Sequence, residues 1–156
     1  MTPVITEPDA AAVERLILAC SPQSLSRRFF LPGRPDPGTT WARYRRYLLA
    51  GHSGLAWLGG TPAGLLNLVP ETAQVAELAV LVADPWQRQG VGRALADWLW
   101  RSGHWAGRTV HATVLPDNLP ALAFLRAQGF SAVPVFGQLE REYTRTMTGV
   151  MEEVPG

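Results

Sequence analysis

The spacing of apolar residues along the first fifty positions is typical of short helices. Residues 9–20, a short segment that begins at Ser21-Pro22, and residues 41–50 are each expected to be helical. Asp9 stands where its carboxylate can accept hydrogen bonds from the free amides of the first turn. Residues 4–6 predict a short strand, and residues 31–40, with three prolines and two glycines, predict a loop.

From Ser53 onward, short apolar runs bounded by glycine and proline predict a series of strands. These strands are residues 54–58, 63–69, 75–82 and 109–115, with one or two more between 133 and 146. Helices are predicted at 91–102 and 119–128. The first of these helices carries one apolar stripe, made of Val91, Ala94, Leu95, Trp98 and Leu99. This order of elements predicts a mixed α/β fold in one domain over residues 1–156.

Composition narrows the class of protein. With 156 residues, 47% of them hydrophobic, the chain can bury a core without disulfides or structural metals. A net charge of +1 does not favour nucleic acid or an anionic membrane as a partner. Cys20 is the only cysteine, no apolar run approaches about 18 residues, and the first residues lack the basic start of a signal peptide. We therefore expect a cytoplasmic protein in a reducing compartment.

The strongest chemical signal is a turn between a buried strand and an amphipathic helix. Gly90 and Gly92 stand at the start of that helix, where unpaired amides and the helix dipole favour a phosphate group. Glycine lets an anion approach the backbone closely. Arg88 and Arg93 flank the turn and can add charge-assisted hydrogen bonds. The turn predicts a phosphate site, and a tight turn without a ligand is the alternative.

Two common phosphate motifs do not fit this turn. A P-loop requires Gly-Lys-Ser/Thr, and the chain has no lysine. The dinucleotide fingerprint requires a third glycine where Leu95 stands. A different strand–helix nucleotide-binding domain remains as a hypothesis that rests on Gly90-Val91-Gly92 alone.

The segment Gln87-Arg88-Gln89-Gly90-Val91-Gly92 resembles the central motif of the GNAT superfamily of acyl-CoA-dependent N-acetyltransferases, Gln/Arg-x-x-Gly-x-Gly/Ala. A second match follows in Asn118-x-x-Ala121-x-x-Phe124 with Gly129-Phe130, which resembles the next helix of the family. Residues 24–30 also resemble part of the bacterial protein-lysine acetyltransferases of this superfamily. The resemblance implies a single domain with a mixed, mostly antiparallel sheet flanked by helices.

The resemblance further implies acetyl-CoA or another acyl-CoA as cosubstrate. Its pyrophosphate would lie on the turn formed by Gln87, Arg88, Gln89, Gly90, Val91 and Gly92, with Arg93 beside it. Its pantetheine arm would lie along Val80, Leu81 and Val82 and pair like an added strand. Asn118 and Ala121 belong to the second motif, where Asn118 would contact the pantetheine or simply cap its helix.

Acyl transfer to an amine requires a base, because a lysine-like acceptor has a pKa of about 10.4. Glu77 is the catalytic candidate, because it is a lone carboxylate in an apolar strand and the family often has glutamate there. A solvent-facing Glu77, or one paired with an arginine, is the alternative. His111 is a second candidate for a base or proton relay, and no spacing of His, Cys and carboxylates suggests a metal site.

The general acid is missing from its usual position. Many family members carry tyrosine where this chain has Leu125, and leucine cannot donate a proton. Tyr44, Tyr47, Tyr143 or water are substitutes, or the thiolate leaves unassisted. A noncatalytic acyl-CoA-binding regulator or sensor is therefore the alternative function.

The segment before position 50 is strongly basic. Residues 21–50 hold six arginines and one acid, a local net charge of +5. In the family this region borders the acceptor site, so the resemblance implies a primary amine, of a protein lysine or a small molecule, that is not polycationic. A solvated helix face is the alternative. Trp86 and Trp100 could stack on adenine or face a partner chain, which leaves a homodimer open.

Overall fold

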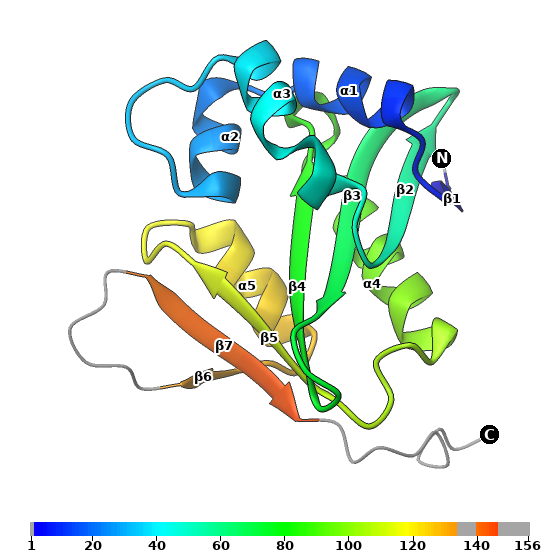
Figure 1. Ribbon diagram of the computed structural model, residues 1–156, viewed down its shortest axis with the longest axis vertical. Helices are drawn as coiled ribbons and strands as arrows, with labels where there is room; N and C mark the ends of the chain where they lie inside the picture. Colours follow the sequence, from blue (N-terminus) through cyan, green and yellow to red (C-terminus); the bar gives the residue numbers. More distant parts are fainter. Residues whose placement is uncertain (1, 134–139, 147–156) are drawn as a thin grey trace.

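In the computed structural model, residues 2–133 and 140–146 are described, and within them seven strands form one sheet in the order β1-β2-β3-β4-β5-β7-β6 (Figure 1). The strands are β1 (Val4–Thr6), β2 (His52–Leu58), β3 (Thr61–Pro70), β4 (Val75–Val82), β5 (Thr109–Val114), β6 (Ser131–Val133) and β7 (Arg141–Thr146). The helices are α1 (Ala10–Leu18), α2 (Pro22–Phe29), α3 (Pro37–Leu48), α4 (Val91–Ser102), α5 (Leu119–Ala127) and the short 3₁₀ helix η1 (Asp84–Trp86).

The sheet is mixed and mostly antiparallel, which confirms the predicted fold class. Every pair of neighbouring strands is antiparallel except β4 and β5, which run parallel. A parallel pair needs a crossover connection, and α4 provides it between these two strands. The β4–β5 pair is important because its crossover starts with the turn at residues 87–92, for which the sequence predicts a phosphate site.

The parallel pair β4–β5 is short and then opens. Val75, Ala76 and Glu77 pair with Thr109, Val110 and His111, whereas β4 continues to Val82 with β3 as its paired neighbour. Figure 1 shows the green β4 and the yellow-green β5 diverging from this point. The backbone edge of β4 that faces β5 is therefore available to a ligand beyond Glu77.

Side chains form a core on each face of the sheet. One core joins α4 and α5 to the strands through Leu66, Leu95, Leu99 and Leu125, among others. The other core joins α1, α2 and α3 to the opposite face and includes Leu65. Leu65 and Leu66 are consecutive in β3 and belong to different cores, as the alternation of side chains along a strand requires.

The start of α3 corrects the predicted loop at 31–40. The helix begins at Pro37, ahead of the predicted start at 41, and it ends at Leu48. The Asp36 carboxylate accepts a hydrogen bond from the Thr39 amide at 2.9 Å. Proline is compatible with the first helical position because its missing N–H would have no partner there. Pro37 and Gly38 therefore belong to a helix start and not to a loop.

The other predicted elements are confirmed with shifts at their ends. The helix at 91–102 is α4, in which Val91, Leu95 and Leu99 of the apolar stripe are buried while Ala94 and Trp98 are partly exposed. The predicted strands between 133 and 146 include β7, and β6 begins slightly earlier, at Ser131. Residues 134–139 of that prediction lie outside the described residues.

Gly64 of β3 lies directly beneath α4. A Cβ at this position would stand 2.7 Å from Val91 Cγ1 and 3.2 Å from both the Leu81 carbonyl oxygen and Leu95 Cδ1. Gly64→Ala is therefore expected to lower the free energy of unfolding by about 1–3 kcal/mol through overpacking. Urea unfolding measures this, with Gly38→Ala as the control, because only Asp36 Oδ2 lies near that site, at 3.4 Å. Equal losses in both variants would contradict the packing described.

Candidate functional site

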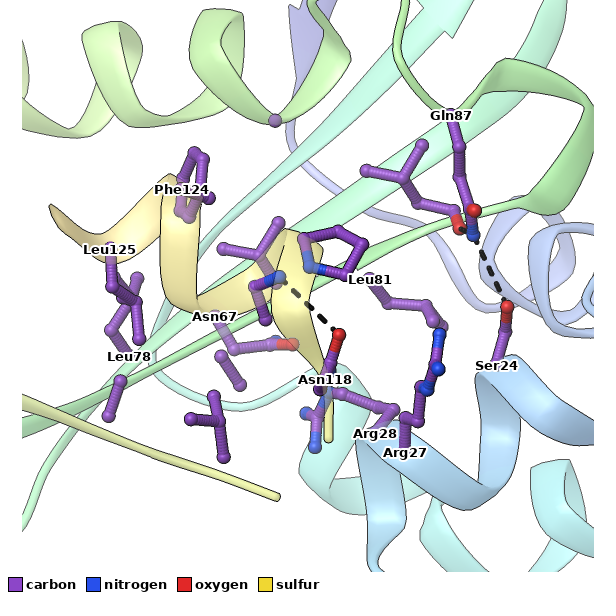
Figure 2. A pocket seen from close by; sticks show the side chains of 18 of the residues that line it. Ser24, Arg27, Arg28, Asn67, Leu78, Leu81, Gln87, Asn118, Phe124 and Leu125 are labelled. Atoms are coloured by element: carbon purple, nitrogen blue, oxygen red, sulfur yellow. Dashed lines mark hydrogen bonds between the residues drawn. The ribbon is translucent and has the colours of Figure 1, made fainter. Parts of the chain in front are cut away.

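A pocket of about 770 Å³ lies where β4 and β5 diverge (Figure 2). Its lining comes from α2, α3, β3, β4, β5, the turn before α4, and α5. The pocket brings together almost all the residues that the sequence singled out, namely Glu77, Val80, Leu81, Val82, Gln87, Arg88, Gly90, Val91, Gly92, Arg93, Asn118 and Ala121. Gln89 is not among the lining residues, and its Nε2 donates to the Pro85 carbonyl oxygen at 3.1 Å.

The start of α4 differs from the starts of the other α-helices. Gly90 adopts a left-handed conformation with φ of 80° and precedes Val91, and no side chain caps this helix. By contrast α1, α2, α3 and α5 are capped by Asp9, Ser21, Asp36 and Asn118. The first amides of α4 therefore lack a side-chain acceptor, and they lie beside the pocket. An anion can satisfy them and interact favourably with the helix dipole.

Asn118 holds its own helix start. Its Oδ1 accepts a hydrogen bond from the Ala121 amide at 3.4 Å, shown as a dashed line in Figure 2. The capping interpretation of Asn118 is thus confirmed. Asn118 also lines the pocket, so it can contact a ligand there. That contact stays a prediction.

The turn before α4 is tied to α2 by a cluster of polar groups. The Asp84 carboxylate accepts hydrogen bonds from the Ser21 amide at 2.7 Å, the Ser21 hydroxyl at 2.8 Å and the Ser24 hydroxyl at 3.1 Å. Gln87 Nε2 donates to the Val82 carbonyl oxygen at 3.0 Å and to Ser24 Oγ at 3.2 Å (Figure 2). The cluster fixes α2 against the turn before α4. These two walls of the pocket are therefore held in a defined position relative to each other.

Asp84 gives this contact a pH dependence. Desolvation raises the pKa of its carboxyl, but the hydrogen bonds from Ser21 and Ser24 outweigh that effect, and the pKa lies below its ordinary value. The contribution to stability is therefore present above the unfolded pKa of about 3.9 and is lost as the pH falls through the lower folded pKa.

Asp84→Asn is expected to remove this part of the loss of stability at low pH. The variant should be less stable than wild type near neutral pH. The difference should shrink as the pH falls below about 4, because the carboxyl group then binds a proton in the unfolded chain, and it should vanish below the lower pKa of the folded protein. Urea unfolding at a series of pH values measures this. Asp97→Asn, on the exposed face of α4, is the matched control. A wild-type advantage that persists undiminished at low pH would contradict the assignment.

Glu77 is the last β4 residue paired with β5, so it stands at the point where the strands open, and it lines the pocket. Arg28 of α2 lines the same pocket. Desolvation lowers the pKa of the Arg28 guanidinium to about 10, and the negative charge of Glu77 partly counters this. The two groups are thus within electrostatic reach. Among the described residues, Arg28 and Glu77 form no ion pair with each other, and the contact found between a basic and an acidic side chain is that of His111 with Glu71.

The candidate proton donors separate into two groups. Tyr44 and Tyr47 of α3 line the pocket together with Leu125, which is 3% exposed. Tyr143 is buried instead, and its hydroxyl lies 3.5 Å from Arg126 Nη2. His111 Nε2 is paired with Glu71, and His111 is not among the residues that line the pocket. Tyr44 and Tyr47 are therefore the phenols that share the pocket with Glu77.

Cys20 is a core residue, as the sequence indicated. Burial, followed by the negative charge of Asp84, raises the pKa of its thiol to about 12. The thiol stays protonated near neutral pH, and a thiol is a poor nucleophile in that form. A covalent intermediate on Cys20 is therefore not part of the chemistry that this site supports.

Asn67 of β3 is a pocket residue that the sequence interpretation missed. Its side chain is 2% exposed, and its Nδ2 donates to the Leu48 carbonyl oxygen at 3.0 Å and to Ser53 Oγ at 2.8 Å. The Leu48 carbonyl can only accept, so the amide nitrogen must face it and the oxygen Oδ1 must face away. The available signal was a lone amide within the apolar run of β3.

The residues that the structure describes contain no group of three or more His, Cys, Asp or Glu side chains placed to hold a metal ion. Among the same residues, none of the helices has the length and apolar character needed to cross a membrane.

Comparison with known proteins identifies the class that this fold and pocket define. The GNAT domain of S. lividans PAT matches with a TM-score of 0.72 and 22% identity, over 92% of this chain and 88% of that chain. An acetyltransferase from Thermus thermophilus matches with a TM-score of 0.70 and 25% identity, over 93% of this chain and 97% of that chain. A GNAT superfamily phosphinothricin acetyltransferase from Sinorhizobium meliloti, solved in complex with AcCoA, matches with a TM-score of 0.73 and 16% identity, over 100% and 94%.

The architecture is thus that of GNAT acetyltransferases. The model of the Acetyltransferase (GNAT) family matches residues 15–130. The chain belongs to this family. A comparison with curated proteins gives no significant match.

Proposed function

We propose that this protein transfers the acetyl group of acetyl-CoA to the primary amine of a protein lysine or a small molecule. The observation that carries the proposal is the pocket between the diverging strands β4 and β5, which ends at the uncapped start of α4. The AcCoA complex of the related Sinorhizobium meliloti enzyme supports the choice of cosubstrate. Bound there, acetyl-CoA would supply an activated thioester.

The lining residues fit the parts of this cosubstrate. We infer that the amides of Gly90 to Gly92 hold the pyrophosphate, with Arg88 and Arg93 adding charge-assisted hydrogen bonds. The open edge of Val80 to Val82 can pair with the amide groups of a pantetheine arm, as a peptide adds to a sheet. Val82 contributes less than its neighbours, because its carbonyl oxygen already accepts from Gln87.

Glu77 is the proposed base. The protonated amine first gives one proton to the Glu77 carboxylate, and the neutral nitrogen then attacks the thioester carbonyl. The new C–N bond forms, the C–S bond breaks, the electron pair of that bond leaves with the thiolate, and the nitrogen releases its second proton to water. Leu125 has no proton to donate to the thiolate. The proton donor is therefore water, Tyr44 or Tyr47, and both tyrosines line the pocket.

Leu125 also keeps a second function open, a noncatalytic acyl-CoA-binding sensor. This alternative shares the pocket and the phosphate turn but requires no base. Transfer to an amine is the observation that separates the two functions. The buried, protonated Cys20 is in keeping with a reducing, cytoplasmic location, which stays a prediction.

Two measurements test the proposal. In a thermal-shift panel of acetyl-CoA, CoA, NAD and ATP, we expect acetyl-CoA and CoA to raise the melting temperature, since a ligand that binds the native state stabilises it by mass action. Thiol release with acetyl-CoA and a panel of amines then measures turnover. Stabilisation by NAD or ATP alone would reject the CoA site, and CoA binding without turnover would favour the sensor.

A further inference from the structure

The guanidinium of Arg28 is a cation without a hydrogen-bonding partner in the described part of the chain. Its side chain extends from α2 toward the pocket (Figure 2). The guanidinium instead lies over the ring of Phe29, whose centroid is 4.7 Å from Arg28 Cζ. Arg28 is partly exposed, and the partial desolvation of a cation is unfavourable unless an anion or hydrogen-bond acceptors compensate. The pocket therefore has a position where an anionic group would be stabilised.

This position differs from the one proposed for the pyrophosphate. Arg88 and Arg93 flank the start of α4, at the turn. Arg28 instead comes from the last turn of α2, and the negative charge of Glu77 acts on it. Arg28 is thus placed near the proposed base, where the acceptor amine would lie.

Asn67 adds a fixed hydrogen-bond acceptor. Its nitrogen is held by Leu48 and Ser53, and the Ser53 hydroxyl in turn donates to the Ala50 carbonyl oxygen at 2.6 Å. No hydrogen bond to Oδ1 is found among the described residues, although Asn67 is only 2% exposed and lines the pocket. An ammonium or amine N–H is the kind of group that such an oxygen binds.

We propose that Arg28, Glu77 and Asn67 form an acceptor subsite for a small α-amino acid. Arg28 binds the carboxylate, while the Glu77 carboxylate and Asn67 Oδ1 receive the amine. The proposal rests on the proposed function, because it takes the amine to be the acetyl acceptor. Its physical basis is that a cation and an anion line one pocket without forming an ion pair with each other, so a zwitterion can satisfy both.

Other acceptors match these groups less well. A protein lysine presents its amine at the end of an apolar stem and brings no carboxylate to Arg28. A polycationic amine meets Arg27 and Arg28 at the wall formed by α2 and is repelled. An α-amino acid carries opposite charges on neighbouring groups, and it is small enough to share the pocket with a pantetheine arm.

The test compares free amino acids with their carboxamides, which keep the amine and remove the negative charge. With acetyl-CoA saturating, kcat/KM is expected to be about 10- to 100-fold higher for the acid than for the amide, the range of a charge-assisted hydrogen bond. Arg28→Gln should bring the ratio close to one by slowing the acids alone. Arg28→Lys, which keeps the charge, should retain most of the preference. Arg46→Gln, which removes an exposed arginine of α3, is the matched control and should keep the full ratio.

A second readout does not depend on turnover. Titration calorimetry of the CoA-loaded protein with the same acids and amides measures binding to the subsite directly. Acid-selective binding that Arg28→Gln removes supports the subsite even if no acetyl transfer occurs, in which case the proposed function alone fails. Equal rates and affinities for acids and amides, faster transfer to a lysine peptide with acidic neighbours, or no binding of either would overturn the subsite.

Discussion

Glu77→Gln is expected to lower kcat/KM for acetyl transfer by about 10²- to 10⁴-fold, the range that a positioned general base contributes. Glutamine has nearly the same shape as glutamate, but it cannot accept the proton that the acceptor ammonium must lose. The affinity for acetyl-CoA should be nearly unchanged, since Glu77 stands where β4 and β5 begin to diverge and away from the turn at α4. Thiol release measures the rate, and calorimetry measures the affinity.

Glu71→Gln is the matched control for this change. Glu71 is paired with His111 and is not among the residues that line the pocket, so activity should stay close to wild type. If Glu77→Gln keeps the wild-type rate across the pH range, Glu77 is not the base. If it lowers acetyl-CoA affinity as strongly as the rate, its role is in building the pocket.

Gly92→Asp is expected to weaken acetyl-CoA binding by at least about 100-fold. Gly92 lies in the first turn of α4 and lines the pocket, and the nearest atom to a Cβ there would be Phe124 Cε1, at 3.4 Å. A Cβ therefore fits there without a clash. Its carboxylate would take the place of the phosphate at the helix start and repel the pyrophosphate, while an acidic residue in the first turn leaves the helix itself stable.

Gln89→Asp places the same charge in the same turn but outside the pocket lining. It should weaken binding only slightly, through long-range repulsion that added salt screens. The affinity is measured by calorimetry, and the melting temperature of each unliganded variant shows that both fold. Equal affinity for acetyl-CoA in Gly92→Asp and wild type would place the pyrophosphate elsewhere.

Local patterns in the sequence are sufficient to predict α4 and the turn that precedes it. Val91, Leu95 and Leu99 recur at helical spacing, and glycine is the residue that most readily adopts the φ of 80° found at Gly90. Pro37 shows the limit of such signals, since proline is compatible both with a loop and with the first turn of a helix. The capping by Asp36 that decides between them depends on conformation.

Much of the acceptor side of the pocket depends on contacts between distant parts of the chain. The bond between Ser24 and Asp84 joins residues 60 positions apart, and no spacing rule relates them. Asn67 points into the pocket because Leu48 and Ser53 hold its amide nitrogen. Arg28 is one of six arginines in a basic segment, and the packing of α2 against the split sheet places it, with Arg27, in the lining of the pocket.

The central claim is that the pocket between β4 and β5 carries out acetyl transfer to an amine. Mass spectrometry of amine acceptors incubated with acetyl-CoA and purified protein tests it most directly. We expect wild-type protein to form an N-acetylated product in the same amount as the released CoA thiol, and Glu77→Gln to form it far more slowly. Tight binding of acetyl-CoA with no acetylated product above the protein-free background, for any amine in the panel, would contradict it.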